Sequence, residues 1–467
     1  MDEVNRHKRI AIMKLRFYYL FDDRPFCVAY SGGKDSTVIV DLVLTMLLEL
    51  RDYYNVELKH KVYIINSNTL AELPPVLKYV KQSIKSIKSY VKKNHLPVFV
   101  KEVVPFPKHT LNVQLFGVGM PPPSTNFRWC TTKLKVMPIE SFLQKQFCNG
   151  RFISIVGSRK SESFDRATRL LRDSIPGTNL KLNTRYANAS NLAPIEDWST
   201  KDVWNYLFNV TSEYLDSSFL WKLYSDASGK DAKECSFVGA GGEHIDKGNI
   251  GCGVSRFGCW QCYMTRDKDK SLDGLYKSGY KNIEYYKAFR DWFWKETQKS
   301  WEITRDVYGH MNHRQMFYNK NNEKYGMTMP KGLMLRLRKK AFKKIMELEL
   351  KLKGQQLISD EEIFLIQERW LKEGDFELSA IEIAKEYQHK FDKEFNIDNL
   401  QKKAKKIRDI FNELKLDCDK KKYSFMTLKR YAAQSVFSPR KVFMQFYPTK
   451  DQERKIRKEW KMGKIID

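Results

Sequence analysis

Short apolar runs alternate with longer helical patterns through the first half of the chain. Buried strands are predicted at Phe26–Ala29, Lys61–Asn66, Pro97–Val100 and Arg151–Val156. Helical spacing is found at Val4–Leu20, from Ser36 onward and at Leu73–Lys93. Strands that alternate with helices are typical of an α/β fold with a doubly wound, mostly parallel sheet.

The first predicted strand leads directly into the run Ser31-Gly32-Gly33-Lys34-Asp35-Ser36, and an apolar helix follows. Glycines let the backbone approach a phosphate closely, and the free N–H groups of a helix start favour negative charge. Lys34 adds a cation, Ser36 a hydroxyl and Asp35 a carboxylate able to approach a phosphate-bound Mg²⁺. The spacing differs from the P-loop pattern of kinases and GTPases. A phosphate cradle of another kind is therefore predicted.

Polar and cationic segments follow the other predicted strands. Asn66-Ser67-Asn68 ends the second strand, and Gly157-Ser158-Arg159, with Glu162 and Arg166 just beyond, follows the fourth. Between the third and fourth strands, a proline-rich loop leads into the run Arg128 to Lys135, which contains Cys130. Ligands on such sheets bind beyond the carboxyl ends of the strands, so these segments are expected to share one edge. Later, Ser199 or Thr200 is predicted to cap a helix that carries Trp204, Leu207 and Phe208.

A glycine-rich stretch contains four cysteines within 28 residues, at Cys235, Cys252, Cys259 and Cys262. The C-x-x-C pair lets two thiolates bind one metal centre, so these four cysteines are the predicted ligands. Zinc and an iron–sulfur cluster both suit four thiolates, and the spacing does not choose between them.

The chain is basic, with a net charge of +27 over 467 residues. Such a charge indicates a polyanionic partner, most simply nucleic acid. Residues 401–467 alone hold 20 Lys or Arg and 8 Asp or Glu. Phosphate contacts are predicted in this distal half, at Arg336, Lys339, Lys340, Lys402, Lys403 and Lys405.

The length of the chain and the composition of its segments predict its domains and its location in the cell. Three regions are predicted: an α/β domain at 1–224, a cysteine-rich loop at 225–272 and a basic helical region at 273–467. No apolar run is long enough for a membrane span, and the first residues lack the apolar core of a secretion signal. A cytoplasmic protein is expected, in which eight cysteines serve as ligands or nucleophiles and do not form disulfides.

Several of these motifs together resemble a known superfamily. Ser31 to Ser36 looks like the PP-loop of ATP pyrophosphatases, and Arg128 to Lys133, Gly157 to Arg166 and Pro194 to Trp204 resemble elements of phosphoadenosine phosphosulfate reductases. The run Cys252 to Cys262, and the later Leu357 to Glu362, look more like the DndC-type sulfurtransferases of DNA phosphorothioation. The resemblance covers about residues 24–372. The reductases' C-terminal cysteine motif is absent from this sequence, which argues against sulfate reduction.

This resemblance implies an enzyme that splits ATP into AMP and pyrophosphate, adenylates the DNA backbone and installs sulfur there, a modification linked to restriction. It implies Mg²⁺ and a 4Fe-4S cluster as cofactors, and a cysteine desulfurase and other phosphorothioation proteins as partners. Lys34, Asp35 and Cys130 are the implied catalytic residues. The implied nucleotide contacts are Ser31, Gly32, Gly33, Lys34, Asp35, Ser36, Arg128, Gly157, Arg159 and Glu162. Cys130 is either a sulfur carrier or the fourth cluster ligand in place of Cys235.

Two rival functions share part of this pattern. A tRNA-thiolating enzyme uses a PP-loop and cysteines but usually places C-x-x-C much nearer the PP-loop. An iron–sulfur protein that binds nucleic acid and ATP without turnover is the second alternative. Pyrophosphate release with and without DNA separates the second alternative from an enzyme.

Overall fold

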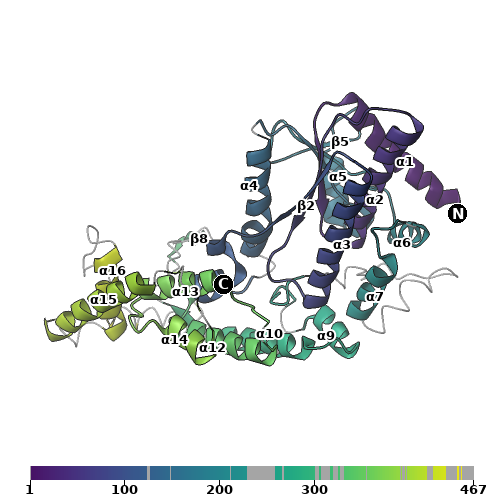
Figure 1. The fold of residues 1–467 in the computed structure, drawn as a ribbon. Coiled ribbons are helices and arrows are strands. Elements are labelled where there is room, and N and C mark those ends of the chain that lie inside the picture. The colour runs from purple at the N-terminus through teal and green to yellow at the C-terminus, as the bar shows by residue number, and fades with distance from the viewer. Residues whose placement is uncertain are drawn as a thin grey trace. The chain divides into compact units, whose positions relative to one another are not determined.

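The computed structural model (Figure 1) divides into two compact units that are both discontinuous in sequence. Unit 1 comprises Met1–Pro105, Cys130–Trp260 and Asp269–Ile283, and unit 2 comprises Phe106–Trp129, Gln261–Lys268 and Glu284–Asp467. The structure describes residues 2–123, 127–147, 149–210, 212–228, 258–265, 268–299, 304–306, 316–318, 324–326, 331–353, 355–389, 391, 395, 397–417, 424–437, 450–451 and 454.

A six-stranded sheet forms the centre of unit 1, with the strand order β3-β2-β1-β4-β6-β5. Five strands are parallel, and the edge strand β5 runs antiparallel to β6. In β1, Phe26 lies opposite Val62 of β2 on one side and Ile153 of β4 on the other. The strands are β1 Phe26–Tyr30, β2 Val62–Ser67, β3 Val98–Val103, β4 Ile153–Ile155, β5 Leu180–Leu182 and β6 Ser190–Leu192.

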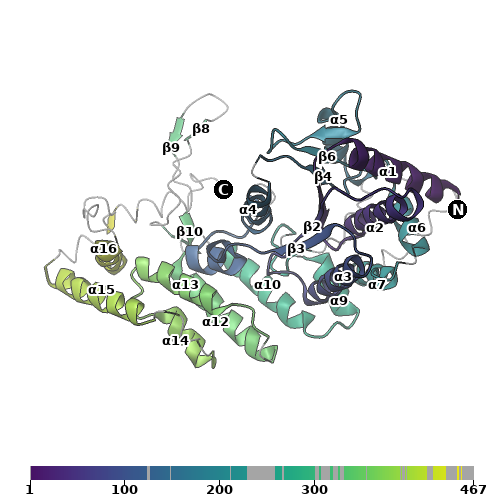
Figure 2. The same cartoon turned by 45° about the horizontal axis from the view of Figure 1, so that its top comes forward.

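Helices cover both faces of this sheet, as Figures 1 and 2 show, with α4 on one face and α2 and α3 on the other. On the α4 face, Cys27, Tyr63 and Ile65 pack with Leu143 of α4 in one apolar cluster. The helical segments of unit 1 are α1 Asp2–Phe21, α2 Lys34–Leu48, η1 Glu49–Tyr53, α3 Pro74–Lys93, η4 Thr131–Val136, α4 Met137–Gln146, η5 Lys160–Glu162, α5 Phe164–Arg172, α6 Thr200–Asn209, α7 Ser217–Ser228 and α9 Lys270–Lys277.

These elements confirm the predicted α/β fold with a mostly parallel sheet. The apolar run of α2 is buried along its length, because this helix lies between the sheet and α1. Ser199 caps α6 as predicted, accepting a hydrogen bond from the Asp202 amide while Asp202 bonds back to Ser199. Trp204 and Leu207 are buried, and the Phe208 ring stacks on Trp204 with centroids 5.9 Å apart although Phe208 is 44% exposed. The two short strands β5 and β6 were not predicted.

Unit 2 is mainly helical and has a core of its own, which confirms the predicted helical C-terminal region. Leu371, Phe376 and Ile381 pack there against Ile407 and Leu428 of the last two helices. Its helical segments are η2 Pro107–His109, η3 Val113–Val118, α10 Ile283–Thr297, α12 Leu335–Lys351, α13 Asp360–Lys372, α14 Ser379–Glu386, α15 Ile397–Asp417 and α16 Phe425–Phe437. Its short strands are β7 Arg305–Asp306, β8 Met316–Tyr318, β9 Lys324–Gly326 and β10 Lys331–Leu333.

The early segment Phe106–Trp129 belongs to unit 2 because buried polar groups of later helices bind its backbone. Trp370 of α13 donates from Nε1 to the Phe116 carbonyl oxygen at 2.7 Å. The buried Arg338 of α12 donates from Nη1 to the Gly117 carbonyl oxygen at 2.6 Å and pairs with Glu373. Buried polar groups need such partners, so these bonds hold the segment in place.

Candidate nucleotide site

The run Ser31 to Ser36 forms a tight turn between β1 and α2, at the carboxyl edge of the sheet. Gly32 has φ +74°, and a Cβ there would lie 2.5 Å from Val80 Cγ2, so a side chain does not fit. The Ser36 hydroxyl donates to the Gly33 carbonyl oxygen at 2.9 Å and accepts from the Ser31 amide at 3.2 Å. The N-cap residue Gly33 has no side chain to accept from the first amides of α2, and a helix start of this kind favours an anion.

Asp35 lies between two cations in the first turn of α2. Its Oδ2 is 2.8 Å from Lys34 Nζ, and its Oδ1 is 2.7 Å from Arg159 Nε. Arg159 is only 1% exposed, and Nη1 also donates to Ser161 Oγ at 2.7 Å. Lys34, Asp35 and Arg159, which the sequence predicted to share one edge, are therefore in direct contact.

Gly157 and Glu162 support this arrangement. A Cβ on Gly157 would lie 3.0 Å from the Asp35 carbonyl group, so the glycine allows the chain after β4 to pass against α2. Glu162 accepts a hydrogen bond from the Arg159 amide at 3.3 Å and pairs with Arg166 at 2.5 Å. Glu162 thus shapes the turn that carries Arg159.

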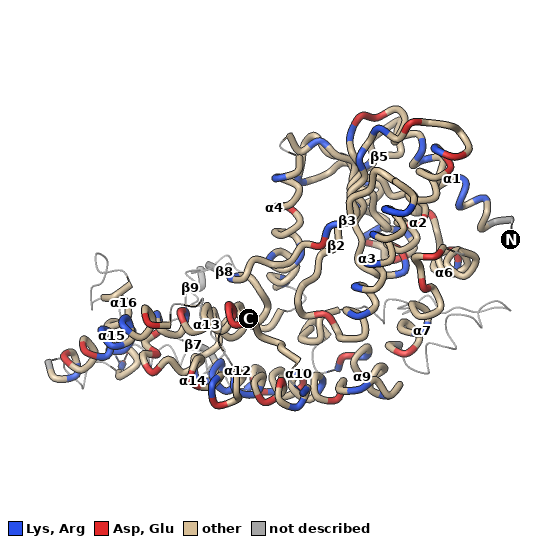
Figure 3. Tube along the Cα trace, in the orientation of Figure 1, with Lys and Arg blue, Asp and Glu red and all other residues tan. Residues whose placement is uncertain are grey.

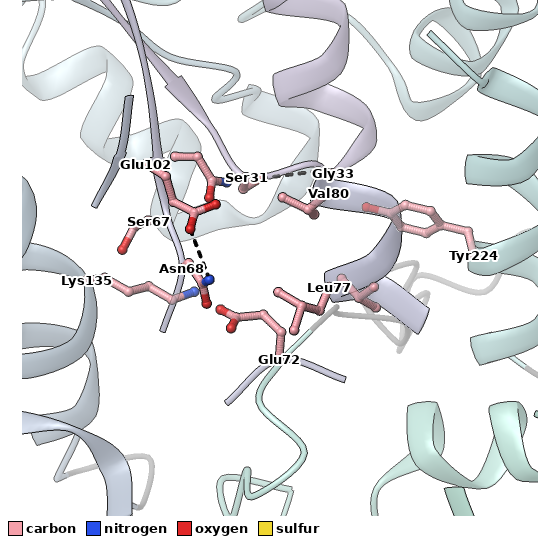
Figure 4. Close-up of a pocket in the computed structure, with 12 residues that line it drawn as sticks. Ser31, Gly33, Ser67, Asn68, Glu72, Leu77, Val80, Glu102, Lys135 and Tyr224 are labelled. Carbon is pink, nitrogen blue, oxygen red and sulfur yellow. Dashed lines mark hydrogen bonds between the residues drawn. The ribbon is translucent and has the colours of Figure 1, made fainter. Parts of the chain in front are cut away.

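A pocket of unit 1 opens beside the turn (Figure 4). Its floor comes from the loop after β2, where Asn68 Nδ2 donates to Glu102 Oε1 at 3.3 Å. Its apolar wall comes from α3, through Val76, Leu77 and Val80. The lining also includes Ser31, Gly33, Asn66, Ser67, Glu72, Lys135 and Tyr224.

Three polar lining residues were not singled out from the sequence, namely Glu72, Glu102 and Tyr224. Lys135 ends the run Arg128 to Lys135, which was expected at this edge. Tyr224 reaches the turn from α7, and its hydroxyl accepts from the Lys34 amide at 3.4 Å. Burial raises the pKa of Tyr224, so the phenol stays protonated. No sequence signal marked this tyrosine, because α7 is distant along the chain.

Cys130 and Arg128 lie on opposite sides of a boundary between the units. Cys130 is half-buried, belongs to unit 1 and immediately precedes η4. Arg128 is exposed and belongs to unit 2. A nucleotide contact by Arg128 and a sulfur-carrying role for Cys130 stay predictions.

The predicted metal ligands are described only in part. Cys235 and Cys252 lie outside the described residues. Cys259 Sγ is 3.4 Å from Thr69 Oγ1, and the next amide, of Trp260, donates to the Ala71 carbonyl oxygen at 2.9 Å. In unit 2, the Cys262 carbonyl oxygen accepts from Arg290 Nε at 3.1 Å. Within the described ranges, no group of three or more His, Cys, Asp or Glu could hold a metal ion. The four-thiolate site thus stays a prediction.

The predicted nucleic-acid contacts all lie in unit 2. Figure 3 shows Lys and Arg concentrated along α15, where Lys402 and Lys405 are exposed. Lys403 is half-buried, with Nζ 5.4 Å from the centroid of the Phe437 ring. On α12, Arg336 and Lys340 are exposed. Lys339 turns inward and binds Asp375 at 2.6 Å and Ser379 Oγ at 2.7 Å, which makes it the least available of the six.

No helix in the described part of the chain is long and apolar enough to cross a membrane.

Known proteins resemble this chain over parts of its length. It is 28% identical over 216 residues to Uncharacterized protein MJ0066 of Methanocaldococcus jannaschii, covering 45% of this chain and 37% of that protein. Uncharacterized protein MJ0973 of the same organism is 25% identical over 304 residues, which cover 62% of this chain and 56% of that protein. The chain thus spans between about a third and just over half of the length of these relatives.

Solved structures show weaker similarity. An FMN adenylyltransferase of Candida glabrata, in complex with FMN and an ATP analogue, matches with TM-score 0.29 and 13% identity over 45% of this chain and 57% of that chain. The U34-tRNA thiolase NcsA from Methanococcus maripaludis, with its 4Fe-4S cluster, matches with TM-score 0.28 and 16% identity. The match covers 50% of this chain and 75% of that chain.

A family model gives the broader assignment. Residues 25–264, just over half of the chain, match the model of the phosphoadenosine phosphosulfate reductase domain. This range begins just before β1 and includes the PP-loop turn, Arg159, the pocket and the C-x-x-C pair. The chain therefore belongs to the phosphoadenosine phosphosulfate reductase domain family.

Proposed function

We propose that the protein is an ATP-dependent sulfurtransferase that splits ATP between its α and β phosphates and modifies the DNA backbone with sulfur. The observation that carries the nucleotide part of this proposal is the contact of Lys34, Asp35 and Arg159 at the start of α2, where Gly33 is the N-cap residue. Amides and cations held in fixed positions stabilise the charge that develops on departing pyrophosphate. The basic composition and the resemblance to DndC-type proteins support DNA as the acceptor.

Lys34 has fewer hydrogen-bond partners than Arg159 among the described residues. Arg159 is fixed by several hydrogen bonds, whereas Lys34 Nζ is held by Asp35 and stands 5.7 Å from the Tyr224 ring centroid. We infer that a bound triphosphate draws Lys34 away from Asp35. One carboxylate oxygen of Asp35 then becomes available while Arg159 keeps the other in position.

The freed oxygen of Asp35 suits Mg²⁺, which proteins usually hold through one or two carboxylates together with substrate phosphates. When bound, Mg²⁺ would neutralise phosphate charge. The described residues do not form an all-protein metal cage, which agrees with a metal carried in on the nucleotide.

The proposed reaction has three displacements. A non-bridging oxygen of a DNA phosphodiester attacks the α-phosphorus of ATP, and the bond to the β-phosphate oxygen breaks. This converts a poor leaving group, a phosphate oxygen, into AMP. Sulfur supplied as a cysteine persulfide then displaces AMP at the DNA phosphorus, and a second thiolate attacks the carrier sulfur, which leaves as a disulfide. Cys130 is the proposed carrier, with a cysteine desulfurase as the donor.

The test measures pyrophosphate release from ATP with duplex DNA, with tRNA and with neither. DNA-stimulated release is expected, and Asp35→Ala or Ser36→Ala should lower it by about a hundredfold or more. Asp52→Ala is the matched control, because Asp52 is exposed and pairs with the neighbouring Arg51. Unchanged release in both PP-loop variants would remove the nucleotide assignment.

A second measurement tests the acceptor. Mass spectrometry of nucleosides from cells with and without this gene should show phosphorothioate-linked dinucleotides in DNA only when the gene is present. Thiolated tRNA nucleosides that depend on the gene would instead identify a tRNA-thiolating enzyme. ATP binding without pyrophosphate release under any condition would favour a nucleic-acid-binding protein without turnover.

A further inference from the structure

Two buried acceptor atoms in the pocket beside the PP-loop turn have no hydrogen-bond partner among the described residues. They are Oδ1 of Asn66 and Oε2 of Glu72, and both residues line the pocket. Buried polar atoms in folded proteins are nearly always paired. Two unpaired acceptors in one pocket therefore indicate a ligand that brings hydrogen-bond donors.

The orientation of both side chains is fixed by their other contacts. Asn66 is 3% exposed, and Nδ2 donates to the Tyr30 carbonyl oxygen at 2.9 Å. A carbonyl can only accept, so the amide nitrogen must face Tyr30 and Oδ1 is the free atom. Glu72 Oε1 accepts from both the amide and the hydroxyl of Thr69, at 2.8 and 2.7 Å. Oε2 is thus the atom left without a partner.

The remainder of the pocket suits a flat apolar ring. Val76, Leu77 and Val80 of α3 form its wall, and Val76 and Val80 are nearly buried. Figure 4 shows the Glu72 carboxylate between Leu77 and Asn68, on the same side of the pocket as this wall. A purine face can pack on the valines and the leucine while its edge reaches the two acceptors.

We propose that Asn66 and Glu72 read the six-amino group of adenine and so select ATP over nucleotides with a six-carbonyl group. This inference rests on the proposed ATP site. The exocyclic amine of adenine is a donor, whereas guanine and hypoxanthine carry a carbonyl acceptor at that position. A carbonyl oxygen facing these two acceptors leaves all three oxygens without a hydrogen-bond donor, which lowers the affinity for the nucleotide.

Glu72→Gln gives a sharp test because its geometry is determined in advance. The Gln carbonyl oxygen must keep the place of Oε1, where the Thr69 donors hold it. The amide nitrogen therefore replaces Oε2 and presents a donor to the pocket. The variant therefore keeps the contacts with Thr69 but has a hydrogen-bond donor where the parent has the acceptor Oε2.

The experiment compares kcat/KM for pyrophosphate release from ATP, ITP and 2′-deoxy-ATP. The parent should prefer ATP to ITP by about tenfold or more. Glu72→Gln should lower this ratio by about tenfold through KM, with kcat little changed. Glu213→Gln, which alters an exposed carboxylate paired with Lys93, should keep the ratio of the parent.

The outcomes separate the two proposals. Equal use of ATP and ITP by the parent, or an unchanged ratio in Glu72→Gln, would overturn the specificity inference while ATP cleavage stands. If Glu72→Gln changes only the preference for ATP over 2′-deoxy-ATP, Glu72 contacts the ribose. This result would also overturn the specificity inference. If no nucleotide is bound or cleaved by the parent, the proposed function itself fails. Competition binding of ATP and ITP to Glu72→Ala provides a readout independent of turnover, and selectivity equal to that of the parent would contradict the inference.

Discussion

At the scale of single residues, the buried Arg159 shows how the site is stabilised. Its guanidinium is almost completely removed from water, and its partners are the Asp35 carboxylate, Ser161 Oγ and the Trp198 carbonyl oxygen. A buried charge is costly unless it is paired and hydrogen-bonded. Arg159 therefore belongs to the core of unit 1 as much as to its nucleotide edge.

Replacing Arg159 by Met should destabilise the protein by about 3–5 kcal/mol, because Asp35 and the surrounding acceptors lose their partner. Urea unfolding monitored by circular dichroism measures this. Arg151→Met is the control, since Arg151 pairs with Asp23 on the surface and both side chains are more than half exposed. The control should change stability by less than about 1 kcal/mol. Equal effects of the two substitutions would show that Arg159 is not a structural anchor.

At the scale of elements, the start of α13 joins a helix cap to a titratable group. Ser359 and Glu362 form a reciprocal cap, with the Ser359 amide donating to Glu362 Oε2 at 2.8 Å. Burial raises the pKa of Glu362, and hydrogen bonds from Thr110, Ser359 and Asn112 oppose this rise. Because the folded state holds the proton more tightly than the unfolded chain, this group favours folding at low pH. That contribution is lost as the pH rises from about 4.3 through the folded pKa.

Glu362→Gln removes this titration and retains an acceptor for the Ser359 amide. The stability of the variant relative to the parent should therefore rise between pH 4 and pH 7. Urea unfolding at several pH values measures the difference. Glu361→Gln removes a carboxylate from the exposed neighbouring position in the same turn and is the control. A flat profile for Glu362→Gln would contradict a raised pKa for Glu362.

The basic helix α15 carries the prediction for DNA contact. Lys402→Glu with Lys405→Glu should weaken DNA binding for all sequences alike, because phosphate contacts carry no base information. The slope of log affinity against log salt should become shallower by about 0.9 for each phosphate that the helix no longer neutralises. Fluorescence anisotropy over a salt series measures both.

The matched control reverses two other lysines of unit 2, Lys343 and Lys385, which pair with Glu386 and Glu382. This control changes the net charge by the same amount as the α15 variant. It should reduce the slope of log affinity against log salt by less. If the α15 variant binds as the control does, this helix does not contact DNA. The cations of unit 1 at Lys160, Arg166 and Arg169 would then be the next to test.

At the scale of the whole molecule, the four-cysteine metal site is a prediction that elemental analysis can test. Protein purified without oxygen should be brown and contain iron, and substituting Cys235, Cys252, Cys259 or Cys262 by Ser should reduce the iron content. Cys27→Ser is the control, because Cys27 lies buried in β1 and burial raises its pKa, which keeps it a thiol. Iron and zinc analysis of each variant provides the measurement. A colourless parent with one zinc would exclude the iron–sulfur cluster.

The sequence by itself determined the strands β1 to β4 of the unit 1 sheet and the location of the PP-loop turn. Buried parallel strands have apolar runs without alternation, and the glycine turn between strand and helix is contiguous along the chain. Local patterns therefore predicted β1 to β4, the helices α1 to α3 and the cap of α6. The strands β5 and β6 were missed, because three residues such as Leu180–Leu182 carry no periodicity and form a strand only beside a sheet.

Only the tertiary structure decided which distant residues meet. Tyr224 reaches the Lys34 amide across 190 positions of sequence, and Phe106–Trp129 joins unit 2 through Arg338 and Trp370. No pattern in the sequence distinguishes Glu72, whereas in the structure Thr69 binds its Oε1 and no described residue binds its Oε2. Sequence patterns record spacing along the chain, whereas hydrogen-bond partners and cavities depend on packing between segments, which spacing does not encode.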